Sequence, residues 1–294
     1  MSAGTGPTAR ELAARWGLSK TSRGYRGACP LCAGDAFVVH PGKGGPPVLR
    51  CYYSGCEAAD LHRAAERAVG GTWTAPERKT PDAADDAART AEAMAVWDGA
   101  VPALGTPADT YLTGRALPGL AASPALRWRP EVKHPTRRVL PAMVALVVDV
   151  DGTPRAVHRH YLRRDGSGKA DVRPPKASKG PVGGCAIRLD PAASELVIAE
   201  GVETAASAGR LLSLPAWSAV SCVNLRWTMR LPAEVRSVVI AADLDPAGMM
   251  AVEAAVERWE TEGRRVRVAL PPAPELDCND LLLAAWRGTG AARG

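Results

Sequence analysis

The sequence predicts an α/β protein. A Rossmann-like, mainly parallel sheet is expected in the C-terminal part, preceded by a mixed α/β region rich in basic residues and by a small N-terminal cysteine-rich module. From residue 195 onward, short apolar runs alternate with helix-length segments, as in a parallel sheet with crossover helices. Four of the seven cysteines fall between residues 29 and 56, and eight lysines and arginines fall between 155 and 179. We expect four parts: the cysteine module (1–70), a linker and helix (71–105), the basic α/β region (106–190) and the sheet domain (191–294).

Composition narrows the class of protein. The chain has 294 residues, of which 46% are hydrophobic and 23% charged, as in globular proteins. No apolar run approaches the roughly 18–20 residues that cross a bilayer. The first ten residues lack the apolar segment of a secretory signal, so we expect a cytoplasmic protein. The formal charge of +6 favours an acidic partner.

The cysteine module has the ligand spacing of a zinc ribbon. Cys29 and Cys32 form C-x2-C, and after an eighteen-residue gap Cys51 and Cys56 form C-x4-C. The gap holds two strand-like runs, "AFVVH" and "PVLRC", that can pair antiparallel beneath a metal ion. We expect no hydrophobic core in so small a segment, so that the metal holds it together. The longer second spacing leaves His40 or His62 open as a replacement for Cys56.

The remaining elements up to residue 160 follow local signals. Thr106 is a helix N-cap with proline in the first turn, and Asp151 with Gly152 marks a hairpin turn. Helices are expected at 8–18, 58–70 and 82–98, and a strand at 139–150.

Clustered cations lie just before the apolar strands. As a set, these eight residues predict a surface that binds nucleic-acid or nucleotide phosphates: Arg155, Arg159, Arg163, Arg164, Lys169, Arg173, Lys176 and Lys179. The alternative is a polar, solvated hairpin. His158 and His160 alternate along the strand without an evident ligand partner, so we interpret them as structural.

Acids follow two of the expected parallel strands. "ELVIAEG" ends in Glu200, and "SVVIAADLD" ends in Asp243 and Asp245. Ligands of such sheets collect beyond the carboxyl ends of the strands, and converging carboxylates favour a hard cation such as Mg²⁺ or Mn²⁺. "LDCNDLL" adds Asp277 and Asp280. The alternative for a single acid is a helix cap, or for Glu203 a first-turn helix acid.

These motifs resemble the Toprim domain, in which Glu-Gly after one strand is followed by Asp-x-Asp after another. The domain is shared by bacterial-type primases, type I and II topoisomerases, and some nucleases and recombination proteins. "AADLDPAG" and "DCNDLL" are most similar to the primase branch carried by phages and plasmids. A zinc ribbon, a basic α/β region and a Toprim domain also follow one another in bacterial-type DNA primases, so the resemblance covers almost the whole chain.

The resemblance implies roles for particular residues. Glu200, Asp243 and Asp245 would be the catalytic, magnesium-binding acids, with Asp280 and Asp277 as auxiliary acids. The basic region would hold template and nucleotide phosphates, and the zinc module would engage single-stranded template. Whether Glu200 ligates a metal or acts as general base stays open at this point.

The expected activity is therefore metal-dependent synthesis of short RNA primers from ribonucleoside triphosphates on single-stranded DNA during replication. A Toprim nuclease and a non-catalytic DNA-binding accessory protein are the alternatives. A topoisomerase is disfavoured, because its tyrosine nucleophile needs a second domain that the sequence does not suggest. No G-x4-G-K-[ST] loop occurs, so we expect a separate replicative helicase to unwind the duplex.

Overall fold

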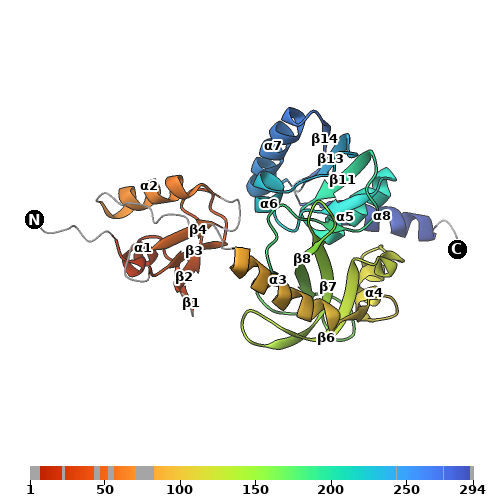
Figure 1. Cartoon of the computed structure of the whole chain (residues 1–294), viewed down its shortest axis with the longest axis horizontal. Coiled ribbons are helices and arrows are strands. Elements are labelled where there is room, and N and C mark those ends of the chain that lie inside the picture. The colour runs from red at the N-terminus through yellow and green to blue at the C-terminus, as the bar shows by residue number, and fades with distance from the viewer. Residues whose placement is uncertain are drawn as a thin grey trace, which may run out of the picture. The chain divides into compact units, whose positions relative to one another are not determined.

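The computed structural model describes residues 7–21, 24–42, 47–51, 56–70, 83–242, 244–273 and 275–291. The chain divides into two compact units, one made of residues 1–80 with 246–251 and the other of 81–245 with 252–294. Figure 1 shows the elements of both units. Among the described residues, no helix is long and apolar enough to cross a membrane.

The first unit is a four-stranded antiparallel sheet with two helices. Its elements are α1 (Ala9–Arg15), β1 (Ser19–Thr21), β2 (Gly24–Gly27), β3 (Phe37–His40), β4 (Val48–Cys51) and α2 (Ala58–Val69). The predicted pairing of β3 with β4 is confirmed, with Phe37 opposite Cys51. The expectation that this module lacks a core is wrong, because Leu12 of α1 and Leu61 of α2 pack with Phe37 in a small buried cluster.

The second unit begins with helix α3 (Ala83–Asp98) and an antiparallel sheet of order β5-β6-β7-β8-β9. The strands are β5 (Val101–Pro102), β6 (Leu126–Lys133), β7 (Val139–Val148), β8 (Pro154–Tyr161) and β9 (Lys176–Lys179). Trp97 of α3 packs with Val144 and Val157 of this sheet. Helix α4 (Pro107–Gly114) starts where the sequence predicts, since the Thr106 hydroxyl accepts a hydrogen bond from the Ala108 amide.

The third sheet has the order β10-β12-β11-β13-β14 and is parallel except for β10. Its strands are β10 (Ile187–Arg188), β11 (Glu195–Ala199), β12 (Ala216–Ser218), β13 (Ser237–Ala241) and β14 (Arg265–Ala269). The helices are α5 (Val202–Leu212), α6 (Cys222–Trp227), α7 (Pro246–Thr261) and α8 (Cys278–Ala291), with α7 and α5 on opposite sides of the sheet in Figure 1. The predicted parallel sheet is thus confirmed. The short β10 and α6 were not predicted, because so few residues carry no periodicity.

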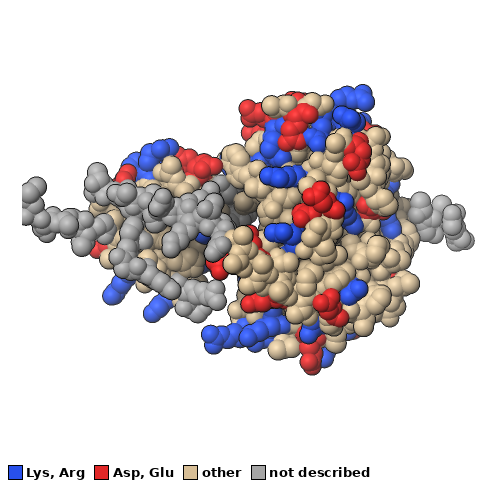
Figure 2. Space-filling view, viewed as in Figure 1, with Lys and Arg blue, Asp and Glu red and all other residues tan. Residues whose placement is uncertain are grey.

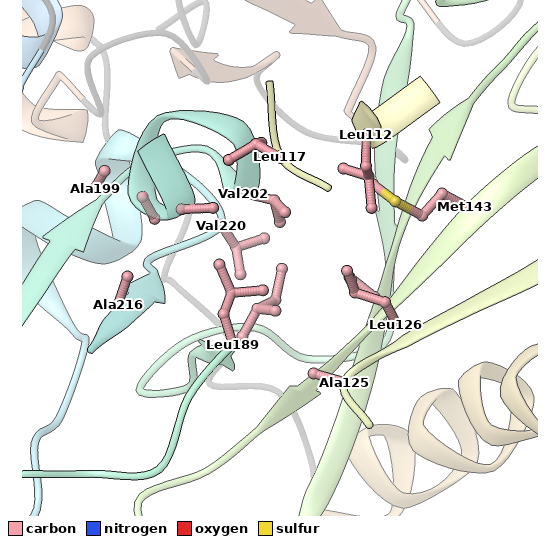
Figure 3. Close-up of a cluster of buried hydrophobic side chains, with 14 of the residues drawn as sticks. Leu112, Leu117, Ala125, Leu126, Met143, Leu189, Ala199, Val202, Ala216 and Val220 are labelled. Carbon is pink, nitrogen blue, oxygen red and sulfur yellow. The ribbon is translucent and has the colours of Figure 1, made fainter. Parts of the chain in front are cut away.

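A shared hydrophobic core joins the two sheets of the second unit. Figure 3 shows Leu112, Leu126 and Met143 from the antiparallel part facing Val202 and Val220 from the parallel part. Because these side chains are buried in one cluster, close packing fixes α5 relative to β7 and β8, and β9 is hydrogen-bonded to β8. This matters for function, because charged side chains of β9 and α5 meet beside the edge of the parallel sheet.

Truncating this core is expected to destabilise the second unit. Leu117 is completely buried, so Leu117→Ala should lower the free energy of unfolding by about 3 kcal/mol through lost burial and a residual cavity. Leu104 is 59% exposed, and Leu104→Ala should change stability by less than about 0.5 kcal/mol. Urea denaturation of the two variants measures the difference. Equal losses would contradict the assigned core.

Candidate active site and metal centre

Glu200 and Asp245 leave the parallel sheet at the same edge. Strands β11 and β13 are neighbours and pair in register, with Ala199 opposite Ala241. Glu200 directly follows Ala199, and the segment leading to Asp245 directly follows Ala241. The predicted acid Asp243 belongs to this segment but lies outside the described residues. The register therefore places the two described acids beyond the carboxyl ends of adjacent strands, where ligands of such sheets bind.

The thiol of Cys222, the first residue of α6, lies close to both acids. Burial, and then the negative charges of Glu200 and Asp245, raise the pKa of the Cys222 thiol to about 12. Charge–charge interactions weaken with distance, so both acids lie in the neighbourhood of this buried thiol. This agrees with the placement of both acids at one edge of the sheet that the strand register indicates.

Hydrogen bonds hold the backbone around this edge. The Ser218 hydroxyl donates to the carbonyl of Glu200 (2.7 Å) and accepts from the amide of Val220 (3.1 Å). Val220 has a φ of +72°, which is unusual for a β-branched residue and is found mostly where surrounding structure enforces it. The buried Asn224 amide donates to the carbonyls of Ala219 and Cys185, both at 2.8 Å. These bonds fix the turn that carries Cys222 next to Glu200.

The carboxyl edge of the parallel sheet offers the kind of ligands that a hard divalent cation prefers. Glu200 is exposed and Asp245 is half-buried, and each offers carboxylate oxygens. Two carboxylates brought together repel each other unless a cation or proton intervenes, and oxygen ligands of this kind suit Mg²⁺ or Mn²⁺. The residues that could hold such an ion are therefore Glu200 and Asp245.

A second, unpredicted cluster surrounds Glu203 in the first turn of α5. Glu203 is buried, and its carboxylate accepts hydrogen bonds from Lys176 Nζ (2.9 Å) and from the Tyr111 hydroxyl (2.8 Å). Lys169 Nζ lies 3.6 Å and His160 Nδ1 3.5 Å from the same carboxylate. Interpreting Glu203 as an ordinary first-turn acid is therefore incomplete, and His160, for which we expected no partner, faces a carboxylate.

The protonation of this cluster follows from burial and charge. Burial by itself raises the pKa of Glu203, but Lys176, His160 and Lys169 outweigh it and hold this pKa well below its usual range. Burial lowers the pKa of His160 despite the opposing effect of Glu203. Burial and the neighbouring carboxylate raise the pKa of the Tyr111 hydroxyl. The carboxylate is therefore ionised, while the tyrosine and histidine are neutral at neutral pH.

The predicted phosphate-binding cations have different environments. Lys176 lies in the Glu203 cluster, and Lys179 pairs with Glu92 of α3 at 2.6 Å. Arg163 and Arg164 are exposed, and Arg155 is half-buried. Figure 2 shows lysines and arginines interspersed with acids over the drawn face of the second unit, so individual positions matter more than a broad patch.

The prediction that Arg159 belongs to the phosphate-binding surface is wrong. Its side chain is buried, and the guanidinium donates to the carbonyls of Ala177 (3.1 Å), Lys133 (3.0 Å) and Ser178 (3.0 Å). A guanidinium committed to three backbone carbonyls inside the protein stabilises the sheet and is not presented to a phosphate. The sequence pattern missed this, because a cation on a strand predicts neither burial nor exposure.

Asp277 and Asp280 cap the start of α8. The Asp280 carboxylate accepts from the Asp277 amide (3.0 Å), and the Asp277 carboxylate accepts from the Asp280 amide (2.8 Å). This reciprocal pair is a capping box, so the capping alternative describes their contacts. Asp277 also lies 3.9 Å from Arg115. A role as auxiliary acids stays a prediction.

The four cysteines of the first unit converge. The sulfurs of Cys29, Cys32, Cys51 and Cys56 all lie within 4.8 Å of one another. The Cys29–Cys56 and Cys32–Cys51 separations are 3.8 and 3.6 Å. Tetrahedral zinc with Zn–S bonds of about 2.3 Å separates its sulfurs by roughly 3.8 Å, so the site fits zinc with Cys56 as fourth ligand rather than a histidine. The neighbouring Cys51 thiol and burial raise the pKa of Cys29, an effect that a cation among the sulfurs would oppose.

Two family models match parts of the second unit. Residues 195–287 match the Toprim domain, and residues 87–189 match a domain of unknown function (DUF7146). No curated protein matches the chain.

Among solved structures, the chain is similar to several primases. The Aquifex aeolicus primase, with its zinc-binding and RNA polymerase domains, is 15% identical with a TM-score of 0.47, over 97% of this chain and 82% of that one. The primase fragment of the bacteriophage T7 primase-helicase is 15% identical with a TM-score of 0.42, over 88% and 93%. The RNA polymerase domain of Mycobacterium tuberculosis primase DnaG, in complex with double-stranded DNA, is 16% identical with a TM-score of 0.44, over 71% and 80%.

Removing a zinc ligand is expected to lower metal content and destabilise the first unit. Cys56→Ser should reduce zinc retained after dialysis from about one ion per chain to well below one, because three thiolates hold the ion less tightly than four. Cys185, buried in the second unit outside this cluster, is the matched control, and Cys185→Ser should retain the ion. Atomic emission spectroscopy measures zinc per chain. Unchanged zinc in Cys56→Ser would contradict the assigned ligand set.

Proposed function

We propose that this chain, whose residues 195–287 are a Toprim domain, is a primase-type nucleotidyltransferase that joins ribonucleotides on a single-stranded DNA template. The observation that supports the proposal best is the in-register pairing that puts Glu200 and Asp245 beyond the carboxyl ends of adjacent strands, with Lys176 of the Glu203 cluster close to the backbone after Glu200. Phosphoryl transfer needs both kinds of group, because carboxylates bind the metal and cations bind the phosphates.

The acids at the sheet edge have a direct role in this reaction. A bound Mg²⁺ or Mn²⁺ would lower the pKa of the attacking 3′-hydroxyl and neutralise charge that develops on the phosphates. Glu200 and Asp245 would hold the ion through their carboxylates, and we propose that Asp243 joins them. Glu200 is exposed at the end of β11, where it could instead accept the proton of the attacking hydroxyl.

Exposed cations and the cysteine module would bind the nucleic acid. Arg163 and Arg164 follow β8 and are exposed, as phosphate contacts require. In the first unit, Arg50 of β4 is exposed one residue before the ligand Cys51, and we propose that this module contacts single-stranded template. A separate helicase would supply unwinding.

Primer synthesis tests the proposal. Labelled ribonucleoside triphosphates, a mixed single-stranded template and Mg²⁺ or Mn²⁺ should yield short labelled oligonucleotides with the intact protein. Glu200→Gln and Asp245→Asn should each reduce the rate by about a hundredfold, since each removes charge that the transition state needs. Glu253, exposed on α7, is the matched control, and Glu253→Gln should keep the rate.

The same preparations should be tested for DNA cleavage. Cleavage that depends on Glu200 and Asp245, without oligonucleotide synthesis, would show a nuclease instead of a primase. Synthesis that survives both substitutions would show that these acids do not form the active site.

A further inference from the structure

Glu203 is the centre of a charged cluster that the metal-binding edge alone does not explain. It is 5% exposed at its side chain, whereas Lys176 and Lys169, whose ammonium groups lie 2.9 and 3.6 Å from it, are 28% and 40% exposed. Tyr111 donates a further hydrogen bond to the carboxylate from α4. The carboxylate is thus inside the protein, and both lysines extend from it to the surface.

The charges of the cluster do not cancel. Two ammonium groups face one carboxylate, while Tyr111 and His160 contribute no charge in their neutral forms. One positive charge is therefore left over at a partly exposed position. A buried ion pair with balanced charges would serve packing alone, but a surplus cation at the surface is suited to an anionic ligand.

The surplus charge lies beside the acids of the sheet edge. A Cβ atom built on Gly201 would lie 3.6 Å from Lys176 Nζ, so this ammonium sits over the backbone directly after Glu200. The Glu200 backbone is itself held by Ser218. If the phosphates of a nucleotide contacted a metal ion held by Glu200, the Lys176 ammonium would therefore lie close to those phosphates.

We propose that Glu203 is the positioning residue that holds Lys169 and Lys176 in place to contact the phosphates of the incoming nucleotide. The role of Glu203 is indirect, since its buried carboxylate cannot reach a ligand. The proposal rests on the proposed function for the identity of the ligand, a nucleoside triphosphate. It adds Glu203 to the residues that serve it.

Physical chemistry explains why such a carboxylate is needed. A lysine side chain has four flexible carbons and loses about 2 kcal/mol of rotamer entropy when it is ordered. Two ammonium groups at one spot also repel each other, and Lys176 contributes to the lowered pKa of Lys169, after burial. Glu203 offsets both effects before the ligand arrives, so that binding does not have to order the lysines.

Isothermal titration calorimetry, which measures the binding of two probes to the full-length protein, tests the proposal. Sodium tripolyphosphate without divalent metal reports on the lysines alone, and Mg²⁺–ATP reports on the lysines together with the acidic edge. Glu203→Gln and Lys176→Met should each weaken tripolyphosphate binding by about tenfold, the size expected for losing one charge-assisted contact. The loss in the double variant should be smaller than the product of the two single losses, because Glu203 acts in part through Lys176.

Controls separate positioning from folding. Glu92→Gln makes the same chemical change in the exposed ion pair with Lys179 and should leave tripolyphosphate binding unchanged. Glu203→Gln disturbs a buried pair, so circular dichroism must show a folded protein. If it does not fold, Lys169→Met is the deciding variant, since its target is partly exposed and it should weaken tripolyphosphate binding by about fivefold.

Each outcome is informative. Additive losses in the double variant, tighter tripolyphosphate binding by Glu203→Gln, or unchanged binding by Lys169→Met would overturn the proposal. If the wild type binds tripolyphosphate with the expected coupling but synthesises no primers, the positioning role of Glu203 stands and the proposed function fails. If primers are made and the coupling is absent, the proposed function stands and the positioning role fails.

Discussion

The in-register parallel pairing of β11 with β13 is the constraint on which the functional interpretation depends. Side chains beyond the last paired residues, Ala199 and Ala241, must leave the sheet at one edge. Backbone hydrogen bonds therefore direct Glu200 and the segment that carries Asp245 to the same edge, although their like charges repel each other. A cation bound between such carboxylates would relieve this repulsion.

The second unit places opposite charge next to this edge without neutralising it. Glu203 begins the same crossover helix that follows Glu200, and β9 of the antiparallel sheet supplies Lys176. The hydrophobic core between the sheets packs β7 and β8 against α5, and β9, which carries the lysine, pairs with β8. The packing of the core thus sets the distances between the charged groups, because these groups are attached to elements that the core immobilises.

Local sequence signals predicted most elements and the convergence of the four cysteines, whereas the magnesium site at the sheet edge stays a prediction. The cysteine spacing, the Thr106 cap and the strands that end in Glu200 and Asp245 are short-range features, and each is found where expected. The Glu203 cluster was missed because its members come from α4, β8, the following loop, β9 and α5. One signal was available: Arg210 is the only other charged residue of α5, and the residues around Glu203 are small or apolar, which predicts a buried helix and hence a buried acid. The burial of Arg159 depends on three carbonyls of β6 and β9, which are far from it in the sequence, and has no sequence signal.

The sharing of one ion by Glu200 and Asp245 is the central claim, and anomalous X-ray scattering from crystals soaked in Mn²⁺ tests it most directly. The account predicts a manganese peak at the carboxyl edge of the parallel sheet, with oxygens of both residues about 2.2 Å from the ion or joined to it through one water. A peak bound by only one of them, or manganese solely at other places on the protein, would contradict the account.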